Sequence, residues 1–562
     1  MQVFLALGSN IGNRQKHLYT ALSKLRRIAS LKDTSFLYDT KAMYEENQSR
    51  FLNAVCKVET DMSPSDLLYA CKRIEKEMGR EKTYRMGPRV IDVDILFYGN
   101  DVVKINKVEG FDDLTIPHQR IAERGFVLKP MCDIAPDYVH PVTKKTVREM
   151  LSAVDAKDCI RVLPLPNGEV LNLQDRLLIM GILNVTPDSF SDGGKWNSLD
   201  SAVSHALQLI DEGADLLDIG GESTRPGAAA ISVDEEIRRV IPVIRALREA
   251  GVRVPISVDT YHSEVARRAV EAGADLVNDI SAGENDPAML PFLAEAAVPV
   301  VLMHKRGNAV TMDKMTRYDD VVHEVADYCR QRADVLMQMG APRWNIIVDP
   351  GLGFAKNTEQ NCQLVKEIPR FNQVTGNMPL LIAASRKRFV GEITKVTKAE
   401  DRVMGTAAIS MYSAEHGAQM VRVHDVKATK QVLDMYYGIV HPFDVFCINR
   451  GRGTHGFQNY FYWNQMDFVK STIAAHPVVV FGKSYCPYCH KALRYLSQTG
   501  CHYLNINLDE RPDGAEIQSA LASLTGRRTV PNVFINQQSI GGGDDTEYLY
   551  RTGELQKLVQ GL

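Results

Sequence analysis

Eight short apolar runs between residues 177 and 425 alternate with segments of helical length, and each run stops abruptly at a polar or charged residue. Short buried strands that alternate with helices are typical of a (β/α)8 TIM barrel, in which parallel strands are covered by an outer ring of helices. We therefore predict such a barrel over residues 175–440. Its expected strands are residues 177–184, 216–220, 255–259, 276–279, 298–304, 346–349, 380–385 and 420–425.

The stretch before the barrel mixes strand and helix periodicities. Strands are expected at residues 2–7, 31–40, 51–59 and 90–97, and amphipathic helices at 14–28 and 63–78. Ser63 followed by Pro64 favours a helix start, because serine caps the first turn and proline is tolerated there. We predict an α+β domain over residues 1–158, with helices on an antiparallel sheet. A polar, proline-containing stretch at 157–174 separates it from the barrel.

The chain after the barrel changes character twice. Residues 441–465 are rich in aromatic residues, glycine and arginine without clear periodicity, and we interpret them as a linker. Residues 466–562 return to a regular pattern, with a strand at 478–481, a Cys-x-x-Cys pair, further helices and a strand at 532–535. This order predicts a third domain of the α/β class.

Length, charge and cysteine usage narrow the class of protein. A chain of 562 residues fits two to four domains at a size of roughly 100 to 200 residues each. The net charge of −3 is spread along the chain and gives no electrostatic footprint for nucleic acid or an anionic membrane. Ten scattered cysteines favour a reducing compartment, and no apolar run approaches the roughly 20 residues of a bilayer span. We therefore expect a cytoplasmic protein that acts on small molecules.

The carboxyl ends of the predicted barrel strands concentrate candidate chemistry, because in such barrels the residues that end the strands surround one pocket. These residues are Asn184, Asp259, Asn278, Asp279, Asp349, Ser385, Arg422 and His424. Carboxylates such as Asp259 and Asp349 suit paired N–H donors like those on the edge of a pterin. Positive charge for a phosphate-bearing ligand comes from Arg225, Lys387, Arg422 and His424. Any one of these residues could be polar only because the barrel rim is solvated, but the whole set favours a site.

A pair of acids in the first domain suggests a magnesium site. Asp92 and Asp94 alternate on a predicted strand, so both carboxylates project from one face. Mg²⁺ takes few protein ligands and binds well between carboxylates and phosphate oxygens. The chain has no G-x-x-x-x-G-K-[ST] loop, which excludes an ordinary P-loop. The alternative is a solvated edge face, which is a common setting for such acid pairs.

The third domain has a candidate thiol site. Cys486 and Cys489 follow an apolar strand and open a helix, where the helix dipole and Lys483 favour the thiolate form of Cys486. A Thr529-Val530-Pro531 turn with a cis proline would bring backbone groups beside that thiolate. The alternatives are a zinc site, for which Cys501 and His502 are the nearby candidates, and a pair of buried cysteines.

Four blocks of the barrel region resemble dihydropteroate synthases: residues 180–194, 218–227, 349–356 and 385–387. The resemblance implies condensation of 6-hydroxymethyl-7,8-dihydropterin pyrophosphate with 4-aminobenzoate, and a homodimer formed through the barrel. It also implies roles for the pocket residues. Asn184 would ligate Mg²⁺, Arg225, Arg422 and His424 would bind pyrophosphate, Asp259, Asn278, Asp349 and Lys387 the pterin, and Thr224, Pro226 and Phe354 the aminobenzoate.

Residues 7–14, 87–94 and 116–128 resemble hydroxymethyldihydropterin pyrophosphokinases. The resemblance implies a ferredoxin-like fold that moves pyrophosphate from ATP to the pterin hydroxymethyl group. Asp92 and Asp94 would hold Mg²⁺, and the implied substrate residues are Arg80, Arg89, His118 and Arg124 with Asn53 and Phe126 on the pterin.

The region from residue 468 onwards resembles a dithiol glutaredoxin, which implies a thioredoxin-like fold and glutathione-dependent disulfide reduction. Cys486 would attack and Cys489 would resolve. The implied glutathione contacts are Lys483, Thr529, Val530, Pro531, Asp544 and Asp545.

Together these resemblances predict a fused enzyme of folate biosynthesis with an appended thiol reductase, in which the first domain makes the substrate of the barrel. Two alternatives stay open. One or more domains could be inactive and serve as assembly or redox-regulatory modules. A pterin-using methyltransferase on a related barrel is also conceivable, although it gives no reason for an attached kinase.

Overall fold

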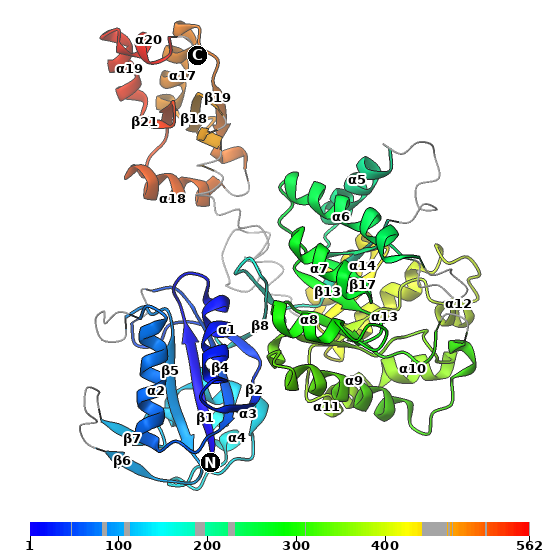
Figure 1. Ribbon diagram of the computed structural model, residues 1–562. Coiled ribbons are helices and arrows are strands. Elements are labelled where there is room, and N and C mark those ends of the chain that lie inside the picture. Colours follow the sequence, from blue (N-terminus) through cyan, green and yellow to red (C-terminus); the bar gives the residue numbers. More distant parts are fainter. Residues whose placement is uncertain are drawn as a thin grey trace. The chain divides into compact units, whose positions relative to one another are not determined.

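The computed structural model describes residues 1–45, 48–80, 87–105, 113–185, 197–222, 231–308, 311–440, 469, 472–474, 476–511 and 514–560. The chain forms two compact units, residues 1–452 and 453–562. The first unit contains the N-terminal domain and the barrel, and the second contains the C-terminal domain (Figure 1).

The N-terminal domain is an antiparallel sheet between two helical layers, which confirms the α+β prediction. Strand residues alternate between the layers, as a pleated sheet requires. Leu5 and Leu7 share an apolar cluster with α1 and α2, whereas Phe4 packs with α3 and α4. The sheet order is β5-β1-β4-β3-β8-β9, with β2 also on β4. The elements are β1 (Gln2–Ser9), α1 (Arg14–Leu25), β2 (Ser30–Thr34), β3 (Leu37–Thr40), β4 (Phe51–Glu59), α2 (Pro64–Glu77), β5 (Asp92–Tyr98), β6 (Val103–Ile105), β7 (Leu114–Ile116), α3 (Gly125–Ile134) and α4 (Val147–Ser152).

The observed bounds of the helices and strands in this domain agree with the prediction at some positions and differ at others. Ser63 accepts the backbone N–H of Asp66 and Pro64 opens α2, as expected. The single strand expected at 31–40 is instead two strands, because the buried Ser35 interrupts it and accepts the N–H of Val55 at 2.9 Å. The stretch at 157–174 is also more than a separator. It forms β8 (Ile160–Pro164) and β9 (Val170–Asn172), which extend the sheet beyond β3.

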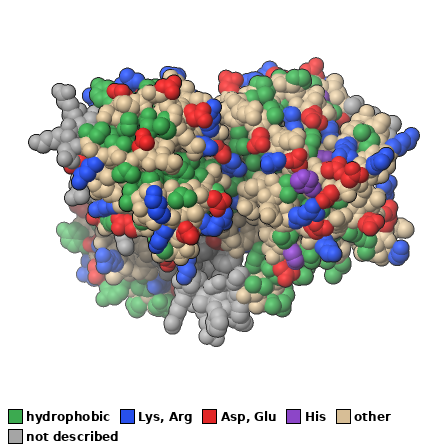
Figure 2. Space-filling view, turned by 90° about the horizontal axis from the view of Figure 1, so that it is seen from below, with side chains coloured by type: hydrophobic (Ala, Val, Ile, Leu, Met, Phe, Trp, Pro, Cys, Tyr) green, Lys and Arg blue, Asp and Glu red, His purple; other side chains and the backbone are tan. Residues whose placement is uncertain are grey.

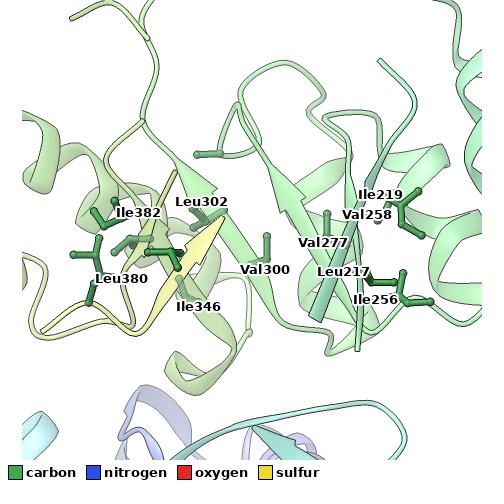
Figure 3. Close-up of a cluster of buried hydrophobic side chains, with 14 of the residues drawn as sticks. Leu217, Ile219, Ile256, Val258, Val277, Val300, Leu302, Ile346, Leu380 and Ile382 are labelled. Carbon is green, nitrogen blue, oxygen red and sulfur yellow. The ribbon is translucent and has the colours of Figure 1, made fainter. Parts of the chain in front are cut away.

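The barrel has eight parallel strands, as predicted. Seven ladders join them in the order β15-β14-β13-β12-β11-β10-β17-β16, and a bridge between Val348 and Leu380 nearly closes the ring. Apolar strand residues pack outward against the helices, as Figure 3 shows for Leu217, Ile219 and Val258. The strands are β10 (Leu178–Asn184), β11 (Leu216–Gly220), β12 (Ile256–Asp259), β13 (Leu276–Asp279), β14 (Val300–Met303), β15 (Ile346–Asp349), β16 (Leu381–Ile382) and β17 (Met420–Val423). The helices are α5 (Asn197–Asp211), α6 (Val233–Glu249), α7 (Ser263–Glu271), α8 (Met289–Ala296), α9 (Val321–Gln338), α10 (Thr358–Lys366), α11 (Ile368–Val374), α12 (Arg388–Thr394), α13 (Val403–Glu415) and α14 (Val426–Val440).

A short turn of the barrel completes the core of the N-terminal domain. The turn η4 (Arg343–Asn345) precedes β15, and its Trp344 is 2% exposed within the apolar cluster of α1 and α2. The Trp344 indole N–H donates to the Tyr19 hydroxyl at 3.3 Å. Arg343 donates to both oxygens of Asp33 at 2.9 Å, a bidentate ion pair. The two domains of the first unit therefore share buried apolar surface as well as charge pairs.

The C-terminal domain is a mixed sheet with helices on both faces, as in thioredoxin-like folds. The sheet order is β19-β18-β20-β21, with β18 parallel to β19 and antiparallel to β20. Val479 and Phe481 face α18, whereas Val478 and Val480 face α17 and α20. The elements are β18 (Val478–Gly482), α17 (Pro487–Thr499), β19 (Leu504–Asn507), α18 (Gly514–Thr525), β20 (Asn532–Ile535), β21 (Gln538–Gly541), α19 (Gly543–Arg551) and α20 (Glu554–Leu558).

The surface charge is mixed. Figure 2 shows acidic and basic side chains interspersed over the face in view, in keeping with the net charge of −3. Among the described helices, none is both long enough and apolar enough to cross a membrane.

Candidate functional site

The carboxyl ends of the barrel strands bring most of the predicted pocket residues together. The parallel register pairs Gly220 with Asp259 and Asp259 with Asn278, so neighbouring strands end at one level. Arg422, on β17, donates from Nη2 to Asp259 at 2.5 Å and from Nε to Asp218. One guanidinium group therefore links two carboxylates inside the barrel.

Burial dominates the electrostatics of this pocket. It raises the pKa of Asp259 to about 7, although Arg422 opposes the shift, and it raises the pKa of Asp349 to about 6. Burial also lowers the pKa of Lys387 to about 8, against the attraction of both carboxylates. A ligand that offers N–H donors and an anionic group would compensate these desolvated charges better than the protein does alone.

A tight loop after β15 forms the wall beside Asp349. Gly351 has a φ of 65° and donates its N–H to Asp349 Oδ1 at 2.7 Å. A Cβ at this position would lie 1.9 Å from the carbonyl oxygen of His304, so only glycine fits. Lys387 Nζ lies 4.2 Å from the centre of the Phe354 ring. The wall thus presents an aromatic face and a cation beside the carboxylate.

The sequence did not single out Lys356, which stabilises this loop through hydrogen bonds to its backbone. Its buried ammonium lies 2.9 Å from His304 Nδ1 and donates to the carbonyl oxygens of Gly351 and Phe354 at 3.0 and 2.9 Å. Burial lowers its pKa to about 7. Lys356 belongs to a block that resembles the synthases, but a lysine in a loop normally suggests a solvated charge.

Some of the other predicted residues at the pocket rim are described by the structure and some are not. His424 Nδ1 and Ser385 Oγ lie 3.0 Å apart, and Asn184 ends β10 beside Gly220. The predicted ligand residues Thr224, Arg225 and Pro226 lie outside the described residues.

Asp279 differs from the expectation that it faces the pocket. Its carboxylate accepts the N–H groups of Ser281 at 2.8 Å and Gly283 at 2.6 Å, and it is fully buried. Successive residues of a strand face opposite sides, so Asn278 and Asp279 cannot both point into the barrel. Asp279 stabilises the turn after β13 instead.

The predicted magnesium site lies on β5 in the N-terminal domain. Asp92 and Asp94 both face the same side, and Asp92 accepts from Arg80 Nη1 and Arg89 Nη1 at 2.6 Å each. Burial would raise the pKa of Asp92, but the charges of Lys72, Arg80 and Arg89 outweigh it and hold the pKa well below the usual range. The carboxylate is therefore ionised at neutral pH, as a ligand of a hard cation must be.

Sequence reasoning also missed Lys72 and Glu75, which lie on α2 beside these acids. Lys72 Nζ lies 4.0 Å from Asp92, 3.9 Å from Asp94 and 2.7 Å from Glu75. Burial would lower the pKa of Lys72, yet the three carboxylates together raise it. The ammonium group of Lys72 lies close to both Asp92 and Asp94, so these two carboxylates can also accommodate a metal cation. In the sequence the pair is only an i,i+3 contact, which is common on solvated helices.

His118 and Arg124 close the same end of the sheet. Arg124 lies 3.5 Å from His118 Nε2, 3.7 Å from Asp94 and 5.6 Å from the centre of the Phe126 ring. Burial lowers the pKa of His118, which favours its neutral form. On the adjacent strands, Asn53 lies in one row with Gly8 and Asp92. The predicted kinase residues therefore gather around one face.

The thiol pair of the C-terminal domain has the predicted geometry. Cys486 directly precedes α17, and the Val530–Pro531 bond is cis. Cys486 Sγ lies 3.8 Å from the carbonyl oxygen of Val530. Cys489 is buried, accepts the N–H of Lys483 at 3.4 Å, and has its pKa raised to about 12 by burial. The pair is thus asymmetric, with one accessible and one protected thiol.

The acids expected to bind glutathione are engaged within the domain. Asp544 pairs with Lys491 at 2.9 Å, and Asp545 accepts from Arg527 at 2.6 Å and from the N–H of Gly542 at 2.7 Å. Both lie at the start of α19, where backbone N–H groups also favour an anion.

Three family models match the chain in the expected order. They describe 7,8-dihydro-6-hydroxymethylpterin-pyrophosphokinase over residues 4–136, a pterin binding enzyme over 180–424, and glutaredoxin over 478–540.

Similar proteins align with about three quarters of this chain. The folic acid synthesis protein of Schizosaccharomyces pombe is 45% identical over 441 residues, which is 77% of this chain but 58% of that protein. The mitochondrial folate synthesis bifunctional protein of Pisum sativum is 42% identical over 76% of this chain and 87% of its own length. The structure of Plasmodium falciparum HPPK-DHPS with pteroate has a TM-score of 0.64 and 27% identity, and it covers 78% of this chain and 97% of that one. The chain therefore belongs to the family of bifunctional folate synthesis proteins, and it has a glutaredoxin domain after the two folate domains.

Proposed function

We propose that the first two domains catalyse consecutive steps of folate biosynthesis. The N-terminal domain transfers pyrophosphate from ATP to 6-hydroxymethyl-7,8-dihydropterin, and the barrel condenses the product with 4-aminobenzoate to 7,8-dihydropteroate. One observation supports this most strongly. Asp259, Asp349, Lys387 and Arg422 interact with one another at the carboxyl end of the barrel, where buried carboxylates for a donor-rich ring lie beside cations for a diphosphate.

The barrel chemistry follows from that charge arrangement. Breaking the C–O bond leaves negative charge on pyrophosphate and positive charge on the pterin methylene. Arg422, with Arg225 and His424, stabilises the first charge, and Asp259 and Asp349 stabilise the second. Mg²⁺ bound at the amide oxygen of Asn184 would neutralise further phosphate charge.

Substrate placement supplies the rest of the barrel reaction. Asn278 and Lys387 complete the pterin site, while Phe354 with Thr224 and Pro226 holds the aminobenzoate. The arylamine attacks as a neutral nucleophile, so the barrel needs no strong base, and fixed geometry provides much of the rate.

The kinase reaction depends on positioning and charge neutralisation. The ionised Asp92 and the neighbouring Asp94 fit Mg²⁺, which when bound would neutralise the triphosphate of ATP. Arg80 and Arg89, which pair with Asp92 at 2.6 Å, bind phosphate oxygens of ATP together with His118 and Arg124. Asn53 and Phe126 bind the pterin.

The C-terminal domain is proposed to reduce disulfides with glutathione. Cys486 attacks a disulfide sulfur, and one sulfur leaves as a thiol. Cys489 then resolves the mixed disulfide, and two glutathione molecules supply the electrons that return both cysteines to thiols. The glutathione site combines Lys483 and the Thr529, Val530 and Pro531 turn with Asp544 and Asp545.

We propose a homodimer formed through α13 and α14. These helices leave large apolar side chains at the surface, with Met404 77% exposed and Met435 and Ile439 each 65% exposed. Burial of such a patch between two copies would be favourable. We also propose the domain limits 1–158, 175–440 and 466–562 and a cytoplasmic location, which suits the free cysteines of the described residues.

The barrel activity can be tested apart from the kinase. Purified protein is given the pterin pyrophosphate ester and 4-aminobenzoate without ATP. We expect dihydropteroate and pyrophosphate in equal amounts, and loss of both with Asp349→Asn. Formation of neither product by the unaltered chain would favour the alternative, in which the barrel is an inactive assembly module.

A further inference from the structure

A buried acid inside the barrel, Asp218, has no role in the scheme above. It lies on β11 between Leu217 and Ile219, which pack outward against the helices, so Asp218 points into the barrel. Its side chain is 0% exposed. A carboxyl group at such depth requires compensation by specific hydrogen-bond partners.

The partners of Asp218 are two pocket residues. Its Oδ2 accepts from Arg422 Nε at 2.5 Å and from Asn278 Nδ2 at 3.0 Å, and its Oδ1 has no hydrogen-bond partner among the described residues. The buried Asp275 of the barrel differs, because it also binds the backbone. Asp275 accepts the N–H of Ile256 as well as a guanidinium, whereas Asp218 binds side chains alone.

The direction of these hydrogen bonds has a consequence for the ligand. A carboxylate can only accept, so the amide NH₂ of Asn278 must point to Asp218 and the amide oxygen must point elsewhere. Asn278 can then offer only an acceptor to a ligand. In the same way, Asp218 and Asp259 occupy the Nε and Nη2 edge of Arg422, which turns the Nη1 donors away from both acids.

We infer that Asp218 is a positioning residue that fixes the amide of Asn278 as an acceptor for pterin N–H groups and, through the same oxygen, fixes Arg422 for the pyrophosphate. This inference rests on the proposed function of the barrel. It predicts that one carboxylate supports recognition at both ends of the substrate, although it touches neither end.

The test uses the full chain with Asn53→Ala in every variant, so that the barrel is the remaining pterin site. Calorimetric titration measures the Kd of 6-hydroxymethylpterin and, separately, of inorganic pyrophosphate. A saturating non-hydrolysable ATP analogue is present throughout, so that the phosphate-binding residues of the N-terminal domain are occupied. We expect Asp218→Asn to weaken both ligands by about tenfold, or about 1.4 kcal/mol. Asn278→Ala should weaken only the pterin. In the Asn278→Ala background, Asp218→Asn should no longer affect the pterin but should still weaken pyrophosphate.

A matched control separates positioning from general destabilisation. Asp275→Asn removes another buried carboxylate that is paired with an arginine, and it should lower the Tm without changing either Kd. If Asp218→Asn does not fold, Asp218→Glu is titrated in its place, with the same pattern expected. Unchanged affinities, or a full tenfold pterin effect that persists in Asn278→Ala, would overturn the inference. If the Asn53→Ala parent binds neither ligand, the proposed function of the barrel fails instead.

Discussion

At the scale of single residues, the kinase site depends on an acid that is surrounded by positive charge. Asp92 accepts from Arg80 and Arg89 and lies near Lys72. We expect Asp92→Asn to reduce pyrophosphate transfer by about 100-fold or more, because a neutral amide binds Mg²⁺ poorly and leaves these cations unbalanced. The measurement is the rate of pterin pyrophosphate formation with saturating ATP.

The exposed Asp101 provides the control for this change. It follows the same strand, and Asp101→Asn should leave the rate within about twofold, as surface substitutions usually do. A normal rate in Asp92→Asn would mean that the cation is held elsewhere.

The buried charges of the barrel make its stability depend on pH. Burial raises the pKa of Asp259 from 3.8 to about 7, so between these values the folded state binds more protons than the unfolded chain. The contribution of Asp259 to the free energy of unfolding therefore falls as pH rises from 3.8 to about 7. This contribution is greatest at the acid end of the range. Asp259→Asn should flatten that part of the profile. Denaturant titrations of both proteins at pH 5 and pH 7 measure the difference.

Lys387 has the opposite effect on the pH dependence of stability, and at a higher pH. Burial lowers its pKa from 10.5 to about 8, so above pH 8 the unfolded chain binds more protons and stability rises with pH. Lys387→Met should remove this rise. The control is Lys398→Met, which changes an exposed lysine and should leave the rise unchanged. An unchanged slope in Lys387→Met would contradict a buried ammonium group with a lowered pKa.

At the scale of elements, the start of α17 separates the two thiols by function. Cys486 is partly exposed beside the cis proline turn, and Cys489 is buried one helical turn later. We expect Cys486→Ser to abolish glutathione-dependent disulfide reduction. In Cys489→Ser, Cys486 should still attack a disulfide. The mixed disulfide that forms should then persist, because the second cysteine of the motif is missing. Mass spectrometry after treatment with oxidised glutathione should then show one glutathione on Cys489→Ser and none on Cys486→Ser.

The reverse pattern would assign the attacking role to Cys489. Cys501→Ser is the matched control, because this half-buried thiol lies in the same domain outside the motif. It should reduce disulfides at the normal rate.

Elements also show what could be predicted from the sequence. The barrel strands and their polar ends were recognisable, because apolar runs that stop at Asp259, Asp349 or Arg422 leave a periodic signal. Residues that become partners only through the fold left no such signal. Lys72 reaches Asp92 from a different element, and Asp218 is one acid within an apolar run. The sequence pattern does not predict β8 and β9, because short strands in a polar stretch resemble a connection.

At the scale of the whole first unit, the barrel stabilises the N-terminal domain through Trp344. This side chain is 2% exposed within that domain's core, although it belongs to the barrel sequence. We expect Trp344→Ala to destabilise the N-terminal domain by about 3–5 kcal/mol, the usual cost of deleting a large buried aromatic side chain. Kinase activity should then be lost at a lower temperature than in the unaltered chain.

Phe371→Ala provides the comparison, because Phe371 is 1% exposed on the barrel helix α11. It should lower the temperature at which barrel activity is lost more than that for kinase activity. If Trp344→Ala and Phe371→Ala behaved alike, the turn η4 would have no special role in joining the domains.

The most direct test of the account follows both reactions in one intact chain. The protein is incubated with 6-hydroxymethyl-7,8-dihydropterin, ATP, Mg²⁺ and 4-aminobenzoate, and the pterin products are separated and quantified over time. We predict that the unaltered chain forms 7,8-dihydropteroate, that Asp349→Asn stops at the pyrophosphate ester, and that Asp92→Asn forms neither. Failure of the unaltered chain to form dihydropteroate, or full turnover by both variants, would contradict the account.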